Sequence, residues 1–428
     1  MNWVLSIRID KTGFLVPLYV AAAVLFVALA LRSVRLTWLA RAAILALAGA
    51  GVGLVLCWLV SDVWDVFGVA LTTVVRIWIA LLGAGLFLAA ANLWRSRWWR
   101  KVLAVVSAAV FLLATGAAVN VDFGAYRSVG DALGVKPYPA LPVADLTGHV
   151  RPAGTDPWTA PAGMPAKGAL GTVVIPATRS HFPARPASVY LPPAALTAHP
   201  PALPVLVMFP GQPGGPSDVF TSGRVAVTLD RYAAAHQGLA PIVVAPDQLG
   251  RPLKNPMCVD SPLGNSATYL TVDVPNWIRT HLNVLGDPAH WAVGGYSQGG
   301  TCATQFGFGD PQLFGSVIDI LGEREPTIGP DTVAQAFGGS TAKYDAQKPL
   351  SLLAAHKPYT DSYGIFGTGK QDKRYTRYVH TMYTAAKKAG MTTRFVESPH
   401  SGHDWNTVRF VLARALPLLA DHQGLGRG

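Results

Sequence analysis

The sequence predicts two regions of different fold class: an N-terminal four-helix transmembrane domain over residues 1–119 and an α/β domain over residues 168–422. Three observations predict this division. Four long apolar stretches open the chain, short β-rich runs alternate with helical stretches later, and a linker rich in Pro, Gly and Ala, residues 120–167, lies between them. Apolar strands that alternate with helices are typical of a mainly parallel sheet with helices on both faces.

The composition narrows the class of protein. Of the 428 residues, 50% are hydrophobic and 14% are charged, and the mean hydropathy is +0.31. This excludes a disordered or fibrous chain and argues against a purely soluble one. Most of the net charge of +11 comes from residues 1–120, which hold ten basic and three acidic side chains. The excess therefore indicates membrane topology, and because no nucleic-acid motif is present, no nucleic-acid partner is expected. Nothing in the sequence predicts a protein partner.

The four apolar stretches approach or reach the roughly 20 residues that a helix needs to cross a bilayer. The first contains Ala28-Leu29-Ala30, which is similar to a signal-peptide cleavage site, so a cleaved signal is an alternative for that stretch. Three further spans follow directly, which favours a bundle. The stretches cover residues 14–31, 42–60, 77–93 and 102–119.

Charges in the loops predict the orientation of the bundle. Three arginines lie between the first two spans and four basic residues between the last two, whereas the middle loop has Asp62 and Asp65 and no base. By the positive-inside rule, both chain ends lie outside the cytoplasm. We therefore expect a multi-pass plasma-membrane protein with an extracytoplasmic α/β domain. Arg76, at a span edge, can snorkel to the interface, and since the spans hold no Asp, Glu or His, the bundle is predicted to be an anchor.

The α/β region contains eight strand candidates and several helical stretches between the later ones. The strands are expected at residues 171–176, 187–191, 204–209, 240–245, 291–295, 315–320, 362–367 and 393–397. The helices are expected at residues 274–282, 301–308, 375–389 and 405–419.

A nucleophile elbow lies between one of these strands and the next helix. It has the pattern G-x-S-x-G at residues 295–299, with Ser297 at its centre. The turn is so tight that a Cβ at either flanking position would clash, and the following helix N-terminus favours a developing oxyanion. An ordinary Gly-rich turn is the alternative, but the strand and the helix favour catalysis. The pattern predicts an α/β-hydrolase domain.

A nucleophilic serine needs a base and an acid, which in α/β-hydrolases follow in the order Ser, acid, His. His403 and His400 both lie after the last predicted strand, and we prefer His403. Because neither has a Glu or His partner at zinc spacing, no metal or other cofactor is expected. Asp372 lies just past the preceding strand, and we prefer it as the acid to Asp361 and Glu397.

The oxyanion hole needs two backbone N–H groups. One is expected from Gln298, directly after the nucleophile, and the other from the loop after the third strand. Pro210 and Pro213 have no N–H there, which leaves Gly211 or Gln212, and we prefer Gln212.

Two cysteines lie in the α/β region. Cys302 is five residues after Ser297, and Cys258 lies in an upstream loop. In an oxidising compartment they would tend to form a disulfide. Two separate buried thiols are the alternative.

Together, the elbow, the Phe-Pro-Gly loop at residues 209–211 and the Gly-His-Asp-Trp run at residues 402–405 resemble the "Putative esterase" family, which includes esterase D and the secreted mycoloyltransferases. The resemblance covers roughly residues 168–420. It implies an α/β-hydrolase acting on carboxylic esters. A subset of actinobacterial members carries several membrane spans before an extracellular hydrolase domain, and some are implicated in hydrolysing aminoacyl-phosphatidylglycerol. Mycoloyltransferases use Glu as the acid, so Asp372 is more similar to the acid of esterase D.

The sequence therefore predicts a membrane-anchored serine esterase that acts on an ester of a cell-envelope lipid. The alternatives are an acyltransferase that acts on envelope lipids or sugars and a non-catalytic hydrolase-fold binding protein. An aminoacyl ester carries an ammonium that a carboxylate would recognise. Asp319, Glu323 and Glu325 lie at or after the end of the strand that follows the elbow helix, so their loop could reach the pocket rim, and Asp319 and Glu323 are the expected substrate-binding acids. They could instead cap or solvate their loop.

Overall fold

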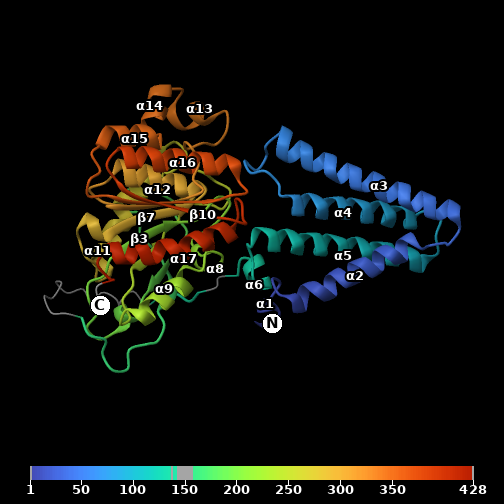
Figure 1. Cartoon of the computed structure of the whole chain (residues 1–428), viewed down its shortest axis with the longest axis horizontal. Coiled ribbons are helices and arrows are strands. Elements are labelled where there is room, and N and C mark those ends of the chain that lie inside the picture. The colour runs from blue at the N-terminus through green and yellow to red at the C-terminus, as the bar shows by residue number, and fades with distance from the viewer. Residues whose placement is uncertain (1, 136–137, 142–157, 427–428) are drawn as a thin grey trace. The chain divides into compact units, whose positions relative to one another are not determined.

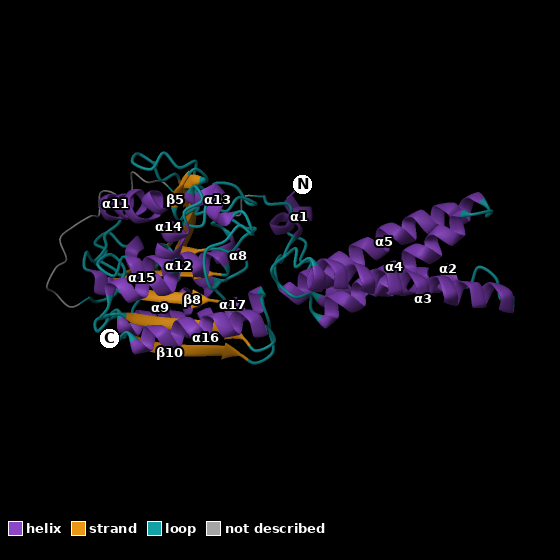
Figure 2. Ribbon diagram, turned by 90° about the horizontal axis from the view of Figure 1, so that it is seen from above, coloured by secondary structure: helices purple, strands orange, loops and turns teal. Residues whose placement is uncertain are grey.

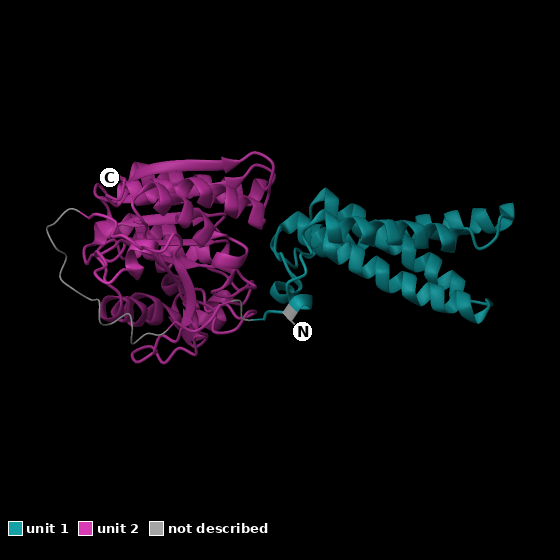
Figure 3. Cartoon of the chain, turned by 90° about the horizontal axis from the view of Figure 1, so that it is seen from below, with its two compact units in different colours: residues 1–135 teal, residues 136–428 magenta. Residues whose placement is uncertain are grey.

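The computed structural model of the chain describes residues 2–135, 138–141 and 158–426. It divides into two compact units, Met1–Val135 and Lys136–Gly428 (Figure 3). Much of the expected linker, residues 120–167, falls outside the described residues. Its described beginning contains the end of one long helix and the short helix α6 (Val129–Ala132). The domain bounds drawn from the sequence stay predictions.

The first unit contains four helices that are long and apolar enough to cross a membrane, as the sequence predicted (Figure 1). The last three are longer than the predicted apolar stretches because Trp or Arg residues before each stretch continue the helical hydrogen bonding. A glycine pair brings two of them close together: a Cβ on Gly49 would overlap the backbone of Gly83. The helices are α2 (Thr12–Ala30), α3 (Leu36–Trp58), which continues as the π-helix η1 (Leu59–Val63), α4 (Thr73–Leu93) and α5 (Trp98–Phe123), preceded by α1 (Asn2–Leu5).

The second unit is built on an eight-stranded sheet in the order β1-β2-β4-β3-β7-β8-β9-β10. Strand β2 pairs antiparallel with β1 and β4, and all other neighbours are parallel. All eight predicted strands are present. They are β1 (Ala169–Val173), β2 (Ala187–Leu191), β3 (Val205–Phe209), β4 (Ile242–Ala245), β7 (Trp291–Tyr296), β8 (Ser316–Ile320), β9 (Tyr363–Gly369) and β10 (Thr392–Ser398). A small hairpin that the sequence did not predict consists of β5 (Asp260–Ser261) and β6 (Gly264–Asn265).

Helices cover both faces of this sheet. Figure 1 shows α12, α15 and α16 on one face and α9 and α17 on the other, and Figure 2 shows the strands side by side. The helices are α8 (Asp218–Thr221), α9 (Val225–Ala235), α10 (Ser266–Thr268), α11 (Val274–His281), α12 (Gln298–Gly309), α13 (Thr332–Phe337), α14 (Thr341–Ala346), α15 (Pro349–His356), α16 (Lys373–Lys388) and α17 (Trp405–His422). Short 3-10 and π turns add η2 (Pro193–Leu196), η3 (Tyr269–Asp273) and η4 (Pro288–His290).

The burial of the strands follows from these layers. Every residue of the central strands β3 and β7 is buried, whereas the edge strand β10 is mostly exposed or half-buried. A strand with both faces covered must be apolar throughout, which is why the central strands read as continuous apolar runs. Since β3, β7, β8, β9 and β10 are parallel, their carboxyl ends meet at one edge of the sheet, where α/β proteins place their ligand sites.

Candidate active site

Ser297 lies on the sharp turn between β7 and α12. Its backbone has φ 56° and ψ −121°, a conformation that a residue with a side chain rarely adopts and that marks a strained turn. The flanking glycines are required here, because a Cβ on Gly295 would overlap the Gly299 carbonyl, and a Cβ on Gly299 would overlap that of Pro210. The turn therefore has the geometry of a nucleophile elbow.

The loop after β10 brings His403 to this serine. His403 Nε2 lies 2.8 Å from Ser297 Oγ, in hydrogen-bond contact. The imidazole packs between two aromatic rings, whose centroids lie 5.2 Å away for Tyr296 and 4.0 Å away for Tyr375. Its loop is fixed by Asp404, whose carboxylate accepts the N–H of Gly402 and caps α17. The imidazole expected to act as the base is thus buried and held in place by its neighbours.

Asp372 lies on the other side of the same imidazole. Its Oδ2 is 3.3 Å from His403 Nδ1, which is within ion-pair distance but does not meet the geometry of a hydrogen bond. Its Oδ1 accepts the backbone N–H groups of Arg374 and Tyr375, each at 3.0 Å, and so caps α16. Burial alone would raise the pKa of Asp372, but His403 and these amides hold it below its ordinary value. A charged carboxylate therefore faces the imidazole.

The rival residues lie elsewhere. Asp361 is exposed just before β9, at the opposite end of that strand from Asp372. Glu397 and His400 are also exposed.

The two expected oxyanion donors lie on adjacent segments of the same sheet edge. Gln298 is the first residue of α12, and Gln212 follows β3. Within the described residues, neither backbone N–H donates to an acceptor. The loop passes directly over the nucleophile turn, since a Cβ on Gly211 would lie 3.4 Å from that of Ser297. Gly211 and Gln212 both remain candidates for the second donor.

The two acids expected to bind substrate have different surroundings. Asp319, in β8, is buried, and its Oδ1 accepts the N–H of Gly322 at 2.9 Å. It lies against Gly300, behind the elbow, because a Cβ on that glycine would come within 2.8 Å of Asp319 Oδ1. Burial raises the pKa of Asp319 to about 7. This enclosure does not favour a contact with substrate.

Glu323 is connected to the nucleophile turn instead. Its backbone N–H donates to Thr301 Oγ1, and the same hydroxyl donates to the Ser297 carbonyl. Its Oε2 is buried and has no hydrogen-bond partner among the residues that the structure describes. Burial raises the pKa of Glu323 to about 7. Burial also raises the pKa of Tyr375, and the negative charge of Glu323 contributes to that shift, so the carboxylate acts on the aromatic wall beside His403.

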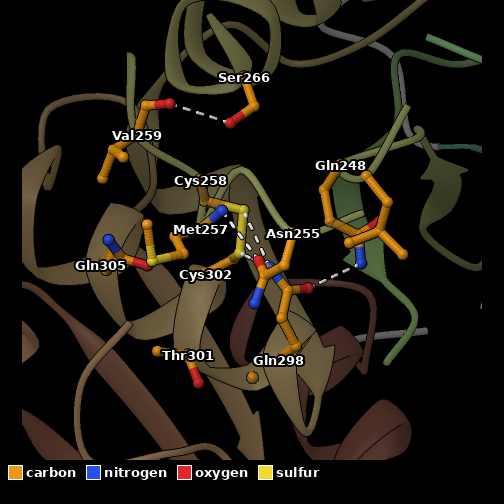
Figure 4. Close-up of a disulfide and its surroundings, with 12 residues drawn as sticks. Gln248, Asn255, Met257, Cys258, Val259, Ser266, Gln298, Thr301, Cys302 and Gln305 are labelled. Atoms are coloured by element: carbon orange, nitrogen blue, oxygen red, sulfur yellow. Dashed lines mark hydrogen bonds between the residues drawn. A yellow bond between two sulfur atoms is a disulfide. The ribbon is translucent and has the colours of Figure 1, made fainter. Parts of the chain in front are cut away.

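A disulfide joins Cys258 and Cys302, whose Cα atoms lie 5.6 Å apart (Figure 4). It ties the loop before β5 to α12, the helix that begins directly after Ser297. The side-chain amide of Gln298 lies beside it, with Nε2 3.2 Å from Cys302 Sγ.

Several residues around the site could not be found from a motif. They are Gln248, Asn255, Tyr375 and Arg185, which contact the elbow, the imidazole or the loop after β3, and Asp247, which pairs with Arg185. Only their position in the sequence could have pointed to two of them: Asp247 and Gln248 closely follow β4, at the edge of the sheet where the carboxyl ends of the parallel strands meet. Within residues 2–135, 138–141 and 158–426, no group of three or more His, Cys, Asp or Glu side chains could hold a metal ion.

The mostly parallel sheet and the strand–turn–helix at Ser297 define an α/β-hydrolase fold. The sequence matches the family described as "Putative esterase" over residues 183–419. The chain belongs to this family and is a hydrolase of carboxylic esters, which argues against the non-catalytic alternative.

Similar proteins extend this picture. An uncharacterized protein of Corynebacterium glutamicum is 34% identical over 363 residues, covering 81% of this chain and 83% of that protein. That match covers more of the chain than the second unit alone contains, so it extends into the helical unit.

Solved structures resemble the second unit. A ferulic acid esterase is 21% identical with a TM-score of 0.50, covering 60% of this chain and 98% of that protein, and it confirms the fold. An S-formylglutathione hydrolase from Agrobacterium tumefaciens is 18% identical with a TM-score of 0.49, covering 61% of this chain and 97% of that protein.

Proposed function

We propose that this protein is a serine esterase with the catalytic triad Ser297, His403 and Asp372, anchored in the plasma membrane, whose extracytoplasmic domain hydrolyses an ester of an envelope lipid. The observation that carries the proposal is the 2.8 Å contact between Ser297 Oγ and His403 Nε2 at a nucleophile elbow. Such a contact lets the imidazole take the hydroxyl proton as the oxygen attacks.

The geometry supports a two-step reaction. His403 accepts the proton of Ser297 while Oγ attacks the ester carbonyl, and the oxyanion that forms accepts the N–H groups of Gln298 and Gln212. His403 then protonates the departing alcohol, which leaves an acyl group on Ser297. Water attacks this acyl-enzyme with His403 again as base, releasing the acid. Asp372 stays ionised because of its low pKa, fixes the tautomer of His403 and stabilises the imidazolium.

The helical unit supports a membrane location. Its four long apolar helices expose large apolar side chains on their outer faces, such as Val24, Leu47, Leu81 and Leu113. The arginine-rich first and third loops favour an orientation with both chain ends outside the cytoplasm. A catalytic domain tethered to the membrane meets lipid headgroups at high local concentration, which favours an ester in the outer leaflet as substrate.

Within that class, an aminoacyl ester of phosphatidylglycerol fits Glu323. Its ammonium lies next to the scissile carbonyl, so a recognising carboxylate must lie close to the nucleophile. The backbone N–H of Glu323 donates to Thr301, which contacts the Ser297 carbonyl, and the charge of its carboxylate acts on Tyr375 beside His403. Its buried Oε2 has no partner among the described residues. An unpaired buried carboxylate gains most from an ammonium ligand, because it has already lost its hydration.

The test uses the full-length protein in lipid nanodiscs. Wild type should hydrolyse a p-nitrophenyl ester, react covalently with a fluorophosphonate and release amino acid from alanyl-phosphatidylglycerol. Ser297→Ala should lose labelling and reduce turnover by about 10⁶-fold, as expected when a triad nucleophile is removed. Ser316→Ala is the matched control, because it removes a buried serine hydroxyl from the neighbouring strand.

Labelling that persists in Ser297→Ala would place the nucleophile elsewhere. Product analysis separates hydrolysis from acyl transfer, because a transferase moves the acyl group to a second lipid or sugar instead of to water. For the topology, an alkaline-phosphatase fusion at the C-terminus should be active and one after Arg97 inactive. The opposite result would reverse the orientation.

A further inference from the structure

Gln248 connects the two segments that carry the candidate oxyanion donors. It follows β4, is fully buried, and lies outside the triad. Its side-chain Nε2 donates to the Pro210 carbonyl at 2.7 Å and to Gln298 Oε1 at 3.1 Å (Figure 4). One amide group thus uses both of its hydrogens to join the loop after β3 to the first residue of α12.

The orientation of this amide is set by its partners. The Pro210 carbonyl can only accept, so the Gln248 side chain must present its NH₂ group to it. The Gln298 side chain must then accept through Oε1, which points its own Nε2 away. That Nε2 is satisfied by Asn255 Oδ1 at 3.0 Å and by the sulfur of Cys302 at 3.2 Å. The disulfide therefore closes a chain of contacts that holds Gln298 in one conformation.

The neighbouring residue holds the other end of the same loop. Asp247 is fully buried and pairs with Arg185 through two contacts, at 2.9 and 2.7 Å. Arg185 in turn donates to the Gly214 carbonyl at 3.0 Å. Two consecutive residues after β4 therefore fix the loop at Pro210 and at Gly214, on either side of Gln212.

From this arrangement we infer that Gln248 is a positioning residue, which sets the spacing between the oxyanion amide of Gln298 and the amide supplied by the loop after β3. The inference rests on the proposed function. Gln248 does not touch the substrate. It holds the Pro210 carbonyl, directly before Gly211 and Gln212, at a fixed distance from the residue that carries the other donor.

Such a residue acts on the transition state and not on substrate binding. The ester carbonyl makes weak contacts with the hole, whereas the full negative charge of the tetrahedral intermediate needs both donors at hydrogen-bond distance. Removing one donor costs about 10²–10³ in kcat. A donor that is displaced but present should cost less, roughly 10- to 100-fold.

The test compares Gln248→Met with wild type in nanodiscs on a p-nitrophenyl ester. We expect kcat to fall about 10- to 100-fold and KM to change less than twofold. The inhibition constant of a trifluoromethyl ketone, whose adduct with Ser297 carries an oxyanion, should rise by the factor by which kcat/KM falls. The pH profile of kcat/KM should keep its acidic limb, because His403 and Asp372 are untouched.

Gln305→Met is the matched control, since Gln305 is a buried glutamine on α12, the helix that begins with Gln298. Its only described side-chain hydrogen bond, to the Gln347 carbonyl, is a long one of 3.4 Å. It should leave kcat unchanged. Equal losses in both variants, or a Gln248→Met variant with wild-type kcat, would overturn the inference. If Gln248→Met does not fold, Gln298→Met replaces it as the test variant. It removes the side-chain acceptor of the Gln248–Gln298 hydrogen bond and keeps the backbone N–H of residue 298. Wild-type kcat in that variant would also overturn it.

Ser297→Ala is measured in parallel. Full activity in Ser297→Ala contradicts the proposed function, whereas an inactive Ser297→Ala with a fully active Gln248→Met contradicts only the role of Gln248.

Discussion

Strands β8 and β9 each carry carboxyl groups near their carboxyl ends, in the strand or in the loop after it, yet the two regions hold them in opposite charge states. Asp372, after β9, has its pKa lowered, whereas the pKa of Asp319 in β8 and of Glu323 after it is raised to about 7. Burial raises the pKa of all three. The difference lies in the donors: Asp372 receives two helix N-terminal amides and faces His403, whereas each of the other two has one stabilising hydrogen bond.

This comparison shows that the supply of hydrogen-bond donors decides which buried acid stays charged. A helix N-terminus provides two amides at no cost in structure, because those amides have no partner inside the helix. The loop after β9 is therefore suited to hold the anion of a triad. The end of β8 and the loop after it hold two carboxyl groups that change their charge near neutral pH.

The largest expected effect tests whether the charged carboxylate of Asp372 is the acid of the triad. Asp372→Asn should lower kcat about 10⁴-fold, because an amide cannot stabilise the imidazolium and favours the wrong tautomer of His403. The fold should persist, since Asn also caps helices, and the change in unfolding free energy should stay below about 0.5 kcal/mol. Steady-state kinetics and thermal unfolding measure the two effects separately.

Asp361→Asn is the control for that experiment, because Asp361 is exposed before the same strand. A 10⁴-fold loss in Asp361→Asn or in Glu323→Gln, with Asp372→Asn active, would show that the acid had been assigned to the wrong residue.

A second prediction concerns Asp319, the buried carboxyl group whose pKa is raised. The pKa of Asp319 is about 7 in the folded protein and near 3.8 when unfolded. Between these values the folded chain keeps a proton that the unfolded chain has released, so the free energy of unfolding falls as pH rises from 4 to 7 and levels off above 7. The total change is on the order of 4 kcal/mol.

Asp319→Asn should remove this pH dependence, since the amide oxygen can still accept the N–H of Gly322. Apparent melting temperatures of wild type and variant in detergent, measured from pH 5 to pH 8, give the comparison. The variant should gain stability relative to wild type as pH rises. A constant difference over this range would mean that Asp319 is already ionised at pH 5.

Much of the fold could be predicted from the sequence. The four long helices and the central strands follow from continuous apolar runs, because a doubly covered strand excludes polar residues. The edge strand β10 has a more polar sequence, and its β-branched and aromatic residues made it recognisable. Short elements were missed, such as the β5–β6 hairpin, where each strand has two residues and no pattern can build up. Helices α13 and α14 have six residues each and show too little periodicity to be recognised.

The residues of the candidate site could be predicted where their position along the chain, directly after a strand, determines where they lie in the fold. Ser297, Asp372 and His403 follow three parallel strands, and the carboxyl ends of such strands meet at one edge, so their closeness could be expected; their catalytic roles remain predictions. The contacts of Gln248 could not be expected, because they depend on how the loop after β3 packs on α12. The sequence did not separate Asp319 from Glu323, because both were expected near the end of the same strand. The structure separates them: Asp319 lies against Gly300 and accepts the N–H of Gly322, whereas Glu323 Oε2 has no hydrogen-bond partner among the described residues.

The smallest expected effect tests whether Glu323 reads the charge of the substrate. Because its pKa is about 7, this carboxyl is mostly neutral at pH 6 and mostly charged at pH 8. An ammonium beside the scissile ester should therefore be favoured more strongly at the higher pH. We expect the ratio of kcat/KM for an alanyl ester over the matching propionyl ester to rise about tenfold between these values, as a charge-assisted hydrogen bond allows. Glu323→Gln should remove the rise in this ratio and leave the hydrolysis of the propionyl ester unaffected.

Glu325→Gln is the control, because Glu325 is two residues away and already pairs with Lys348 at 2.9 Å. A ratio that rises equally in wild type and Glu323→Gln would assign the effect to the substrate's own amine, and a ratio near one at both pH values would favour a neutral lipid ester.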